Sequence, residues 1–307
     1  MAKKSSFESL PREIRTALYR VDEPDTFEVA RNSFDSITVI NKRISRVYKY
    51  VRKNKKNVAL LEKEIENLIR LRDKKIAAPT PLNRQPLKAY DSIVLGYVDG
   101  ALLVNNVLPK HVALLADALK KIHVAFEKEG KTKLADLDSK RVLKPYFAKA
   151  NTGDFLPEQI SYARSIAKAL RSHELNREDM TFVHSDSEFS NVVFEANRAV
   201  LVDWAMAGFA SKYFDLGVGI HALLLEKKAL QPELIRAYLE AYFGEAGPTE
   251  RDAQLIELHV KLRFLERATR HLSESKESQL LGRVRNLKFI DECFRKAQRF
   301  SLAAATK

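Results

Sequence analysis

The stretch that decides the fold covers residues 181–216 and reads TFVHSDSEFSNVVFEANRAVLVDWAMAGFASKYFDL. Two short apolar runs within it, 191–195 and 199–203, flank a polar turn, and this pattern predicts a β-hairpin. Asn191 opens the first strand and Asp203 ends the second. Because a hairpin brings its two ends together, we expect Asn191 and Asp203 to lie close to each other.

The same stretch carries side chains that suit phosphoryl transfer. One carboxylate and one amide oxygen, from Asp203 and Asn191, suit Mg²⁺ when waters and phosphate oxygens complete its shell. Asp186 lies in the polar segment before the hairpin, five residues ahead of Asn191, where it can accept a proton from a substrate hydroxyl. Singly, each is an ordinary surface or capping residue, so the indication of a site rests on their joint spacing.

This spacing resembles that of the kinase-like phosphotransferases, and within them the aminoglycoside phosphotransferase and choline kinase group. Their loop reads His-Gly-Asp-x-x-x-x-Asn and is followed by a hydrophobic strand that ends Ile-Asp-Trp or Ile-Asp-Phe. The matching residues here are His184, Ser185, Asp186, Asn191, Val202, Asp203 and Trp204. The group's later Gly…Asp-Leu element appears as Gly208 and Asp215-Leu216.

The resemblance implies an α+β, protein-kinase-like two-lobe fold, with a small antiparallel-sheet N-lobe and a larger helical C-lobe. Patterns elsewhere in the chain agree with it. They predict strands over 26–31, 36–42, 45–52 and 92–98, and helices over 7–20, 57–74, 109–128, 157–174, 215–228, 231–243 and 249–298, the last with a break near 272–280. We expect a nucleotide-binding lobe with its hinge strand at 1–99, and a helical lobe with the catalytic loop and substrate pocket at 100–307.

In the N-terminal lobe, the resemblance assigns a nucleotide-binding role to four residues. Lys49 occupies the place of the group's lysine strand and would bind the α- and β-phosphates. Glu64 would hold Lys49, because the group places this glutamate four and seven residues before leucines, here Leu68 and Leu71. The backbone groups of Gly96 and Val98, in the hinge strand, would contact the adenine.

In the C-terminal lobe, the resemblance makes Asp186 the residue that orients and deprotonates the acceptor hydroxyl. Asn191 and Asp203 would hold Mg²⁺ and thereby neutralise charge on the transferred phosphoryl group. The predicted activity is an ATP- and Mg²⁺-dependent kinase. It would transfer the γ-phosphate directly to a hydroxyl of a small molecule of amino-alcohol, aminoglycoside or sugar type, without a covalent phosphoenzyme.

Several positions depart from the group's pattern. The loop 31–36 lacks the glycine that often approaches phosphate closely. Ser185 and Ser190 replace glycines, which is compatible only with a backbone outside the left-handed region. Glu188 adds a carboxylate beside the acceptor side, where it either binds a cationic substrate group or is solvated, and we favour solvation. His184 is expected to brace the loop rather than act as a base.

Two further signals have structural interpretations. The run 217–222, GVGIHA, matches a dinucleotide-binding pattern superficially, but it follows Asp215-Leu216 rather than a strand, which favours close helix packing. Mixed charges along 249–298, among them Arg263 and Glu266, predict a solvated face, although this region could also line the acceptor pocket.

Composition narrows the class of protein. The 307 residues contain one cysteine, Cys293, which excludes a disulfide framework and a zinc site built on thiolates. No apolar run reaches the roughly 20 residues that span a bilayer, and the N-terminus lacks the apolar core of a secretory signal. We therefore expect a cytoplasmic protein without a membrane partner; the sequence indicates no particular oligomeric state.

Two other functions stay open at this point. A nucleotide-binding pseudokinase that serves as an interaction module would explain the missing loop glycine, although Lys49, Glu64, Asp186, Asn191 and Asp203 are all present. The net charge of +13 suggests a nucleic-acid partner. The chain lacks interleaved aromatic and basic residues that stack bases, which argues against this partner.

Overall fold

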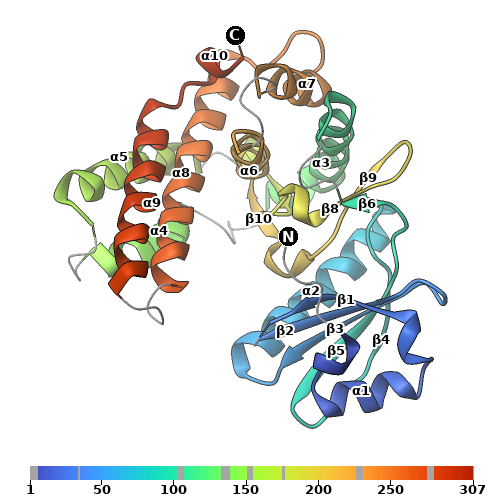
Figure 1. The fold of residues 1–307 in the computed structure, drawn as a ribbon. Coiled ribbons are helices and arrows are strands. Elements are labelled where there is room, and N and C mark those ends of the chain that lie inside the picture. Colours follow the sequence, from blue (N-terminus) through green and yellow to red (C-terminus); the bar gives the residue numbers. More distant parts are fainter. Residues whose placement is uncertain are drawn as a thin grey trace. The chain divides into compact units, whose positions relative to one another are not determined.

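The structure is a computed structural model. It describes residues 6–33, 35–102, 107–132, 139–150, 155–174, 177–225, 231–274 and 280–306. The chain forms two compact units, Met1–Leu102 with Asn191–Ala207, and Leu103–Ser190 with Gly208–Lys307 (Figure 1). The first is built on an antiparallel sheet and the second is mainly helical, which confirms the predicted α+β fold class.

An antiparallel sheet of five strands, in the order β1-β2-β3-β5-β4, forms the centre of the first unit. The strands are β1 (Phe27–Asn32), β2 (Ser36–Asn41), β3 (Arg46–Arg52), β4 (Pro81–Arg84) and β5 (Tyr90–Gly96). The strands predicted in the region 26–52 are confirmed to within a residue or so at each end. β4 was not predicted, and β5 begins and ends two residues earlier than the predicted strand 92–98.

Alternation along β3 decides which way Lys49 points. Tyr48 and Tyr50 are buried in one core cluster with Ile14 and Leu18 of α1 (Arg12–Tyr19). Because successive side chains of a strand point to opposite faces, Lys49 lies on the other face of the sheet. Three short 3₁₀ turns, η1 (Phe7–Ser9), η2 (Pro24–Thr26) and η5 (Trp204–Met206), complete this unit with the elements described next.

Helix α2 (Lys55–Asp73) carries an apolar stripe that includes one carboxylate. The side chain of Asn54 caps the helix by accepting a hydrogen bond from the backbone N–H of Asn57 at 2.8 Å. The buried positions include Leu61, Glu64 and Leu68, whose spacing of three and four residues places them on one helix face. Glu64 is therefore directed inward by the same pattern that buries the leucines.

The predicted hairpin is confirmed, with shorter strands than expected. β8 (Val192–Phe194) pairs with β9 (Ala199–Leu201), and β6 (Ala101–Leu102) pairs with β8 on its other side. The hairpin groups with the first unit, although its sequence falls within the range 100–307 of the predicted C-terminal lobe. The functional division of the chain at 99/100 stays a prediction.

The second unit is a set of helices with one strand pair. The helices are α3 (Pro109–Gly130), α4 (Ser139–Ala150), α5 (Pro157–Glu174), α6 (Tyr213–Leu223), α7 (Gln231–Phe243), α8 (Glu250–Glu274), α9 (Leu280–Arg299) and α10 (Leu302–Ala305). The strand pair is β7 (Met180–Val183) with β10 (Gly208–Ser211), and 3₁₀ turns lie at η3 (Arg177–Asp179) and η4 (Phe189–Asn191). None of the helices among the described residues has both the length and the apolar character that crossing a membrane requires.

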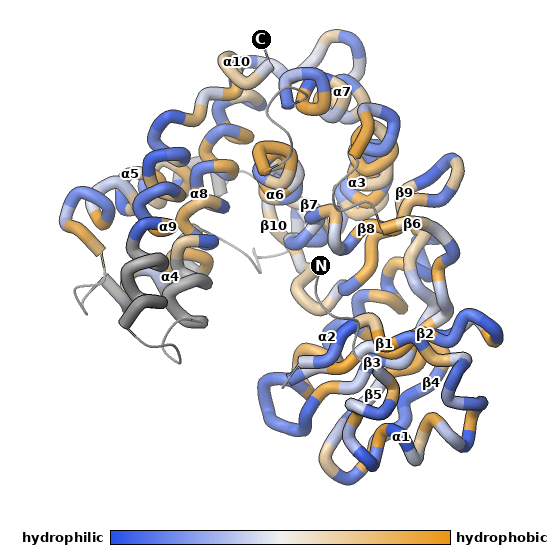
Figure 2. The backbone as a smooth tube through the Cα atoms, in the orientation of Figure 1, coloured by the Kyte–Doolittle hydropathy of each residue, from blue (hydrophilic) through white to orange (hydrophobic). Residues whose placement is uncertain are grey.

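Helix α6 is buried along its whole length, and Figure 2 shows its apolar character. A Cβ atom added to Gly217 would lie 2.6 Å from Cβ of His259 on α8, which is closer than van der Waals contact. A Cβ atom added to Gly219 would collide with the Tyr238 hydroxyl on α7. Both glycines therefore permit close helix packing, and the interpretation of 217–222 as helix packing rather than a dinucleotide loop is confirmed.

Candidate active site

Lys49 connects the sheet, helix α2 and the end of the hairpin within the first unit. Its ammonium Nζ donates hydrogen bonds to Oε2 of Glu64 at 2.6 Å and to Oδ1 of Asp203 at 2.7 Å. The side chain of Glu64 is 2% exposed, that of Lys49 16% and that of Asp203 36%. The structure thus brings together three of the predicted site residues, with Glu64 at the buried end and Asp203 at the accessible end.

In the triad of Lys49, Glu64 and Asp203, burial and neighbouring opposite charges shift the pKa values of Lys49 and Glu64 in opposite directions. Burial alone would lower the pKa of Lys49, but the two carboxylates outweigh it and leave this pKa above its ordinary value. Lys49 therefore stays protonated at neutral pH. Burial raises the pKa of the Glu64 carboxyl, while the Lys49 ammonium and the backbone N–H of Trp204 act to lower it. The buried carboxylate of Glu64 depends on those two donors.

The backbone around Asp203 is fixed by helix α2. Asp203 has a left-handed conformation with φ of 64°, which aspartate tolerates better than most residues. Asn67 Nδ2 donates hydrogen bonds to the carbonyl oxygens of Trp204 at 2.9 Å and Ala207 at 3.3 Å. Sequence reasoning missed Asn67; its signal is its position one helical turn after Glu64 on the same buried face.

The residues predicted to hold a metal ion lie at neighbouring ends of the hairpin. The backbone N–H of Val202 donates to the carbonyl oxygen of Asn191 at 2.9 Å, which extends the pairing by one residue beyond β8 and β9. An amide and a partly exposed carboxylate suit Mg²⁺, which usually keeps several waters and binds through one or two carboxylates. The described residues contain no cluster of three His, Cys, Asp or Glu that could hold a metal by itself.

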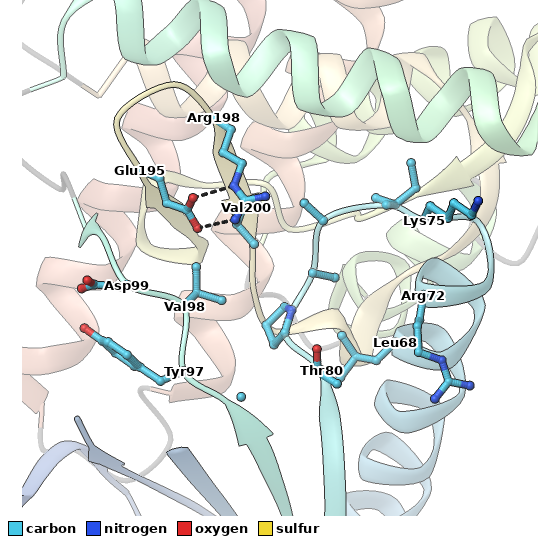
Figure 3. Close-up of a pocket in the computed structure, with 15 residues that line it drawn as sticks. Leu68, Arg72, Lys75, Thr80, Tyr97, Val98, Asp99, Glu195, Arg198 and Val200 are labelled. Carbon is cyan, nitrogen blue, oxygen red and sulfur yellow. Dashed lines mark hydrogen bonds and ion pairs between the residues drawn. The ribbon is translucent and has the colours of Figure 1, made fainter. Parts of the chain in front are cut away.

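The two residues predicted to contact adenine, Gly96 and Val98, lie at a cavity that Lys49 does not line. The N–H of Gly96 donates to the carbonyl oxygen of Thr80 at 2.8 Å, so a contact of Gly96 with adenine would have to use its carbonyl. Gly96 and Val98 line a cavity of about 600 Å³, together with Leu68, Val200 and other residues of the first unit (Figure 3). Lys49 does not line this cavity. The role of Gly96 and Val98 toward adenine stays a prediction.

The glycine-poor turn between β1 and β2 is closed by its own serines. The N–H of Ser33 donates to the carbonyl oxygen of Ser36 at 3.0 Å, and the N–H of Ser36 donates to Oγ of Ser33 at 3.2 Å. Residue 34 of this loop lies outside the described residues. Because both amides are already donated within the turn, these two serines offer no free N–H to a phosphate group.

In the second unit, Asp215 holds the loop that contains Asp186. Its carboxylate accepts the backbone N–H groups of His184 at 2.8 Å and Ser185 at 2.7 Å, and Asp215 is fully buried. His123 Nε2 lies 3.2 Å from the same carboxylate, and His123 Nδ1 lies 2.7 Å from the Tyr242 hydroxyl. The sequence motif contained Asp215, but its role as an acceptor for the loop was not predicted.

His184 braces the loop, as expected. Its side chain is completely buried, and its Nδ1 accepts the backbone N–H of Asp186 at 3.3 Å.

The expectation for the two serines is right for one and wrong for the other. Ser190 has no positive φ, as predicted, but Ser185 has a φ of 68°, in the left-handed region. Hydrogen bonds hold the backbone on both sides of Ser185: the N–H groups of His184 and Ser185 donate to the Asp215 carboxylate, and the N–H of Asp186 donates to Nδ1 of His184. The hydrogen bonds to Asp215 offset the local strain.

We expect Ser185→Gly to raise the free energy of unfolding by about 0.5–1 kcal/mol, because glycine adopts this conformation without steric cost. Ser190→Gly is the matched control and should lower it by about 0.5–1 kcal/mol, since glycine there adds only unfolded-state entropy. Denaturant unfolding measures both. Equal losses in the two variants would contradict the strain at Ser185.

Asp186 is held from helix α8. Nη2 of Arg263 donates to Oδ1 of Asp186 at 2.7 Å and to Oε1 of Glu188 at 2.9 Å, and Nη1 donates to Oε2 of Glu266 at 2.5 Å. The preferred interpretation of Glu188 as a solvated residue is therefore wrong, because it pairs with Arg263. The solvated face predicted for 249–298 is also wrong at Arg263, whose side chain is only 6% exposed.

The antiparallel sheet, the helical unit and the Lys49 triad define a protein-kinase-like phosphotransferase fold. The sequence model of the phosphotransferase enzyme family, designated APH, matches residues 32–254. The chain belongs to this family. Comparison with curated proteins finds no significant match.

Solved structures resemble the chain over almost its whole length. Amicoumacin kinase hAmiN, in complex with AMP-PNP, Ca²⁺ and Ami, is 12% identical with a TM-score of 0.69, covering 94% of this chain and 96% of that one. A choline/ethanolamine kinase family protein from Mesorhizobium loti is 17% identical, with a TM-score of 0.66 and coverage of 98% and 96%. Choline kinase LicA from Streptococcus pneumoniae is 14% identical, with a TM-score of 0.63 and coverage of 92% and 98%. At these identities the likeness supports the fold.

Proposed function

We propose that the protein is an ATP- and Mg²⁺-dependent kinase that transfers the γ-phosphate to a hydroxyl group of a small molecule. The observation that carries this proposal is the protonated Lys49, held at 2.6 Å by Glu64 and at 2.7 Å by Asp203, in a member of a phosphotransferase family. A fixed cation beside a partly exposed carboxylate is suited to phosphate oxygens and their metal ion.

Each residue has one task in the proposed reaction. Lys49 binds phosphate oxygens of ATP, and Glu64 keeps its ammonium in place. Asp186 accepts the proton of the acceptor hydroxyl while the hydroxyl oxygen bonds to the γ-phosphorus, and the bond from that phosphorus to the bridging oxygen breaks to release ADP. Asn191 and Asp203 would hold Mg²⁺, which supplies neutralisation of the charge on the phosphates.

The charge around Asp186 favours a cationic acceptor, such as an amino-alcohol or an aminoglycoside. Asp186, Glu188 and Glu266 each pair with Arg263, so these four side chains together have a formal charge of −2. The side chains of the three carboxylates are 20–32% exposed. An acceptor with an ammonium group would be attracted here, and an anionic acceptor would be repelled. The solved relatives include kinases named for amicoumacin and choline.

The test is release of ADP from MgATP across a panel of amino-alcohols, aminoglycosides, sugars and nucleosides, with ³¹P NMR of the product. We expect one amine-bearing class to accelerate ADP release and to yield a phosphomonoester. A panel that yields no phosphorylated product would overturn the proposal, and unchanged fluorescence of Trp204 on addition of MgATP would in addition argue against nucleotide binding at this site. Trp204 is the only tryptophan and is buried beside Asp203, so its emission reports on this part of the site.

A nucleotide-binding pseudokinase is the second candidate. The observation that favours it is the turn between β1 and β2, where Ser33 and Ser36 donate their N–H groups to each other rather than to a ligand. This candidate predicts a fluorescence change of Trp204 with MgATP, but no phosphorylated product with any acceptor.

A further inference from the structure

Arg263 has a contact pattern that no other described ion pair in the second unit shares. One buried guanidinium binds three carboxylates, two from the loop at Asp186 and Glu188 and one from its own helix at Glu266. The loop carboxylates share one nitrogen, Nη2, while Glu266 binds the other, Nη1. Helix α8 thus presents a preassembled Arg263–Glu266 pair to the loop.

Physical chemistry makes this arrangement rigid. An arginine does not lose its proton in a protein, and burying its charge is costly unless several acceptors satisfy it. Burial acts to lower the pKa of Arg263, yet the charges of Glu266, Asp186 and Glu188 outweigh it and raise that pKa. The planar guanidinium also fixes the directions of its hydrogen bonds, which a lysine ammonium would not do.

We propose that Arg263 is a positioning residue for phosphoryl transfer: it fixes the carboxylate of Asp186 in one orientation through Oδ1, and Glu266 orients the guanidinium that does so. The inference rests on the proposed function of Asp186 as the proton acceptor. A kinase needs its acceptor hydroxyl aligned more than it needs a strong base, so a carboxylate held in one orientation suits the reaction.

A second arginine on the same helix provides a matched control. Arg251 binds the buried carboxylate of Asp179, with Nη2 at 2.5 Å from Oδ2 and Nη1 at 3.3 Å from Oδ1. This pair ties α8 to the segment before β7 and has no contact with Asp186. Arg251→Met should therefore lower stability without changing the turnover number.

The principal variant conserves the charge of the cluster. Arg263→Gln alone would leave three carboxylates facing one another, so it is combined with Glu266→Gln, which keeps the formal charge at −2 because one cation and one anion are removed together. With the most active acceptor of the panel, we expect the double variant to lower kcat by about 10²-fold, the cost of misplacing a reacting group. KM for MgATP should stay within about threefold of the wild-type value.

Two further measurements separate positioning from general loss of structure. Arg263→Lys, which keeps the charge but loses the planar fork, should give a kcat between those of the wild type and the double variant. Hydrogen–deuterium exchange of the unliganded protein should rise in 184–190 for the double variant and stay unchanged there for Arg251→Met.

The outcomes distinguish this inference from the function beneath it. A wild type that phosphorylates no acceptor overturns the proposed function and, with it, the role of Arg263. An active wild type whose double variant keeps its kcat, or whose segment 184–190 exchanges at the wild-type rate, overturns the role of Arg263 alone. A parallel loss of kcat in Arg251→Met would show that α8 acts only through stability, and that also overturns the inference.

Discussion

Asp186→Asn is expected to lower kcat by about 10²–10⁴-fold, the usual contribution of a positioned proton acceptor. An amide has the shape of the carboxylate but cannot take up the hydroxyl proton. The affinity for MgATP, followed by the emission of Trp204, should stay within about twofold, because Lys49, the proposed phosphate ligand, is untouched. Rapid-quench kinetics with the most active acceptor measures kcat, and a fluorescence titration measures affinity.

The control for this change is the same chemical substitution at an exposed position. Asp117 on α3 forms a surface ion pair with Lys121 at 2.7 Å, with its side chain 48% exposed. Asp117→Asn should retain full turnover, since surface pairs of this kind contribute little to stability. If Asp186→Asn turned over ATP as fast as Asp117→Asn, Asp186 would not be the proton acceptor.

Lys49→Met is expected to weaken MgATP binding by about 10²-fold, which corresponds to the loss of a charge-assisted contact worth about 2–3 kcal/mol. The same substitution leaves Glu64 buried without its cation, and such a broken buried pair costs about 3 kcal/mol of unfolding free energy. A fluorescence titration and denaturant unfolding measure the two effects separately.

A double variant tells the two effects apart. Lys49→Met combined with Glu64→Gln removes the buried negative charge, and the glutamine oxygen can still accept the N–H of Trp204. We expect most of the lost stability to return while MgATP binding stays weak. Recovery of nucleotide affinity together with stability would mean that Lys49 supports the fold and does not bind phosphate.

Local patterns were sufficient for much of the first unit. The strand predicted over 45–52 is observed as β3, and strand alternation places Lys49 on the face opposite Tyr48 and Tyr50. The family resemblance, which places a glutamate four and seven residues before leucines, selected Glu64, and the structure places this carboxylate 2.6 Å from Lys49. These features are readable because strand and helix periodicities fix side-chain direction within a few residues.

The contacts that hold the loop were not predictable in this way. Asp215 accepts hydrogen bonds from residues about 30 positions away, and Arg263 reaches Asp186 across 77 positions. Asp215 lies in the matched Asp-Leu element, but no local pattern shows which groups Asp215 or Arg263 contact. The strands β7 and β10 are short and buried throughout, like β8 and β9, but no turn joins them in the sequence, so nothing local marked them as a pair. Helix α4 was not predicted, because the proline at position 145 interrupts the helical sequence pattern.

The two left-handed residues, Ser185 and Asp203, limit how this chain can diverge. Both positions require a backbone that glycine, asparagine and aspartate adopt readily and that β-branched residues adopt at high cost. At position 203 the carboxylate must also face Lys49, which leaves aspartate as the residue that meets both demands. At position 185 Asp215 binds only the backbone N–H, so serine, asparagine and glycine are all compatible with that contact. A motif search that insists on glycine at 185 would therefore overlook members of this family that use serine there.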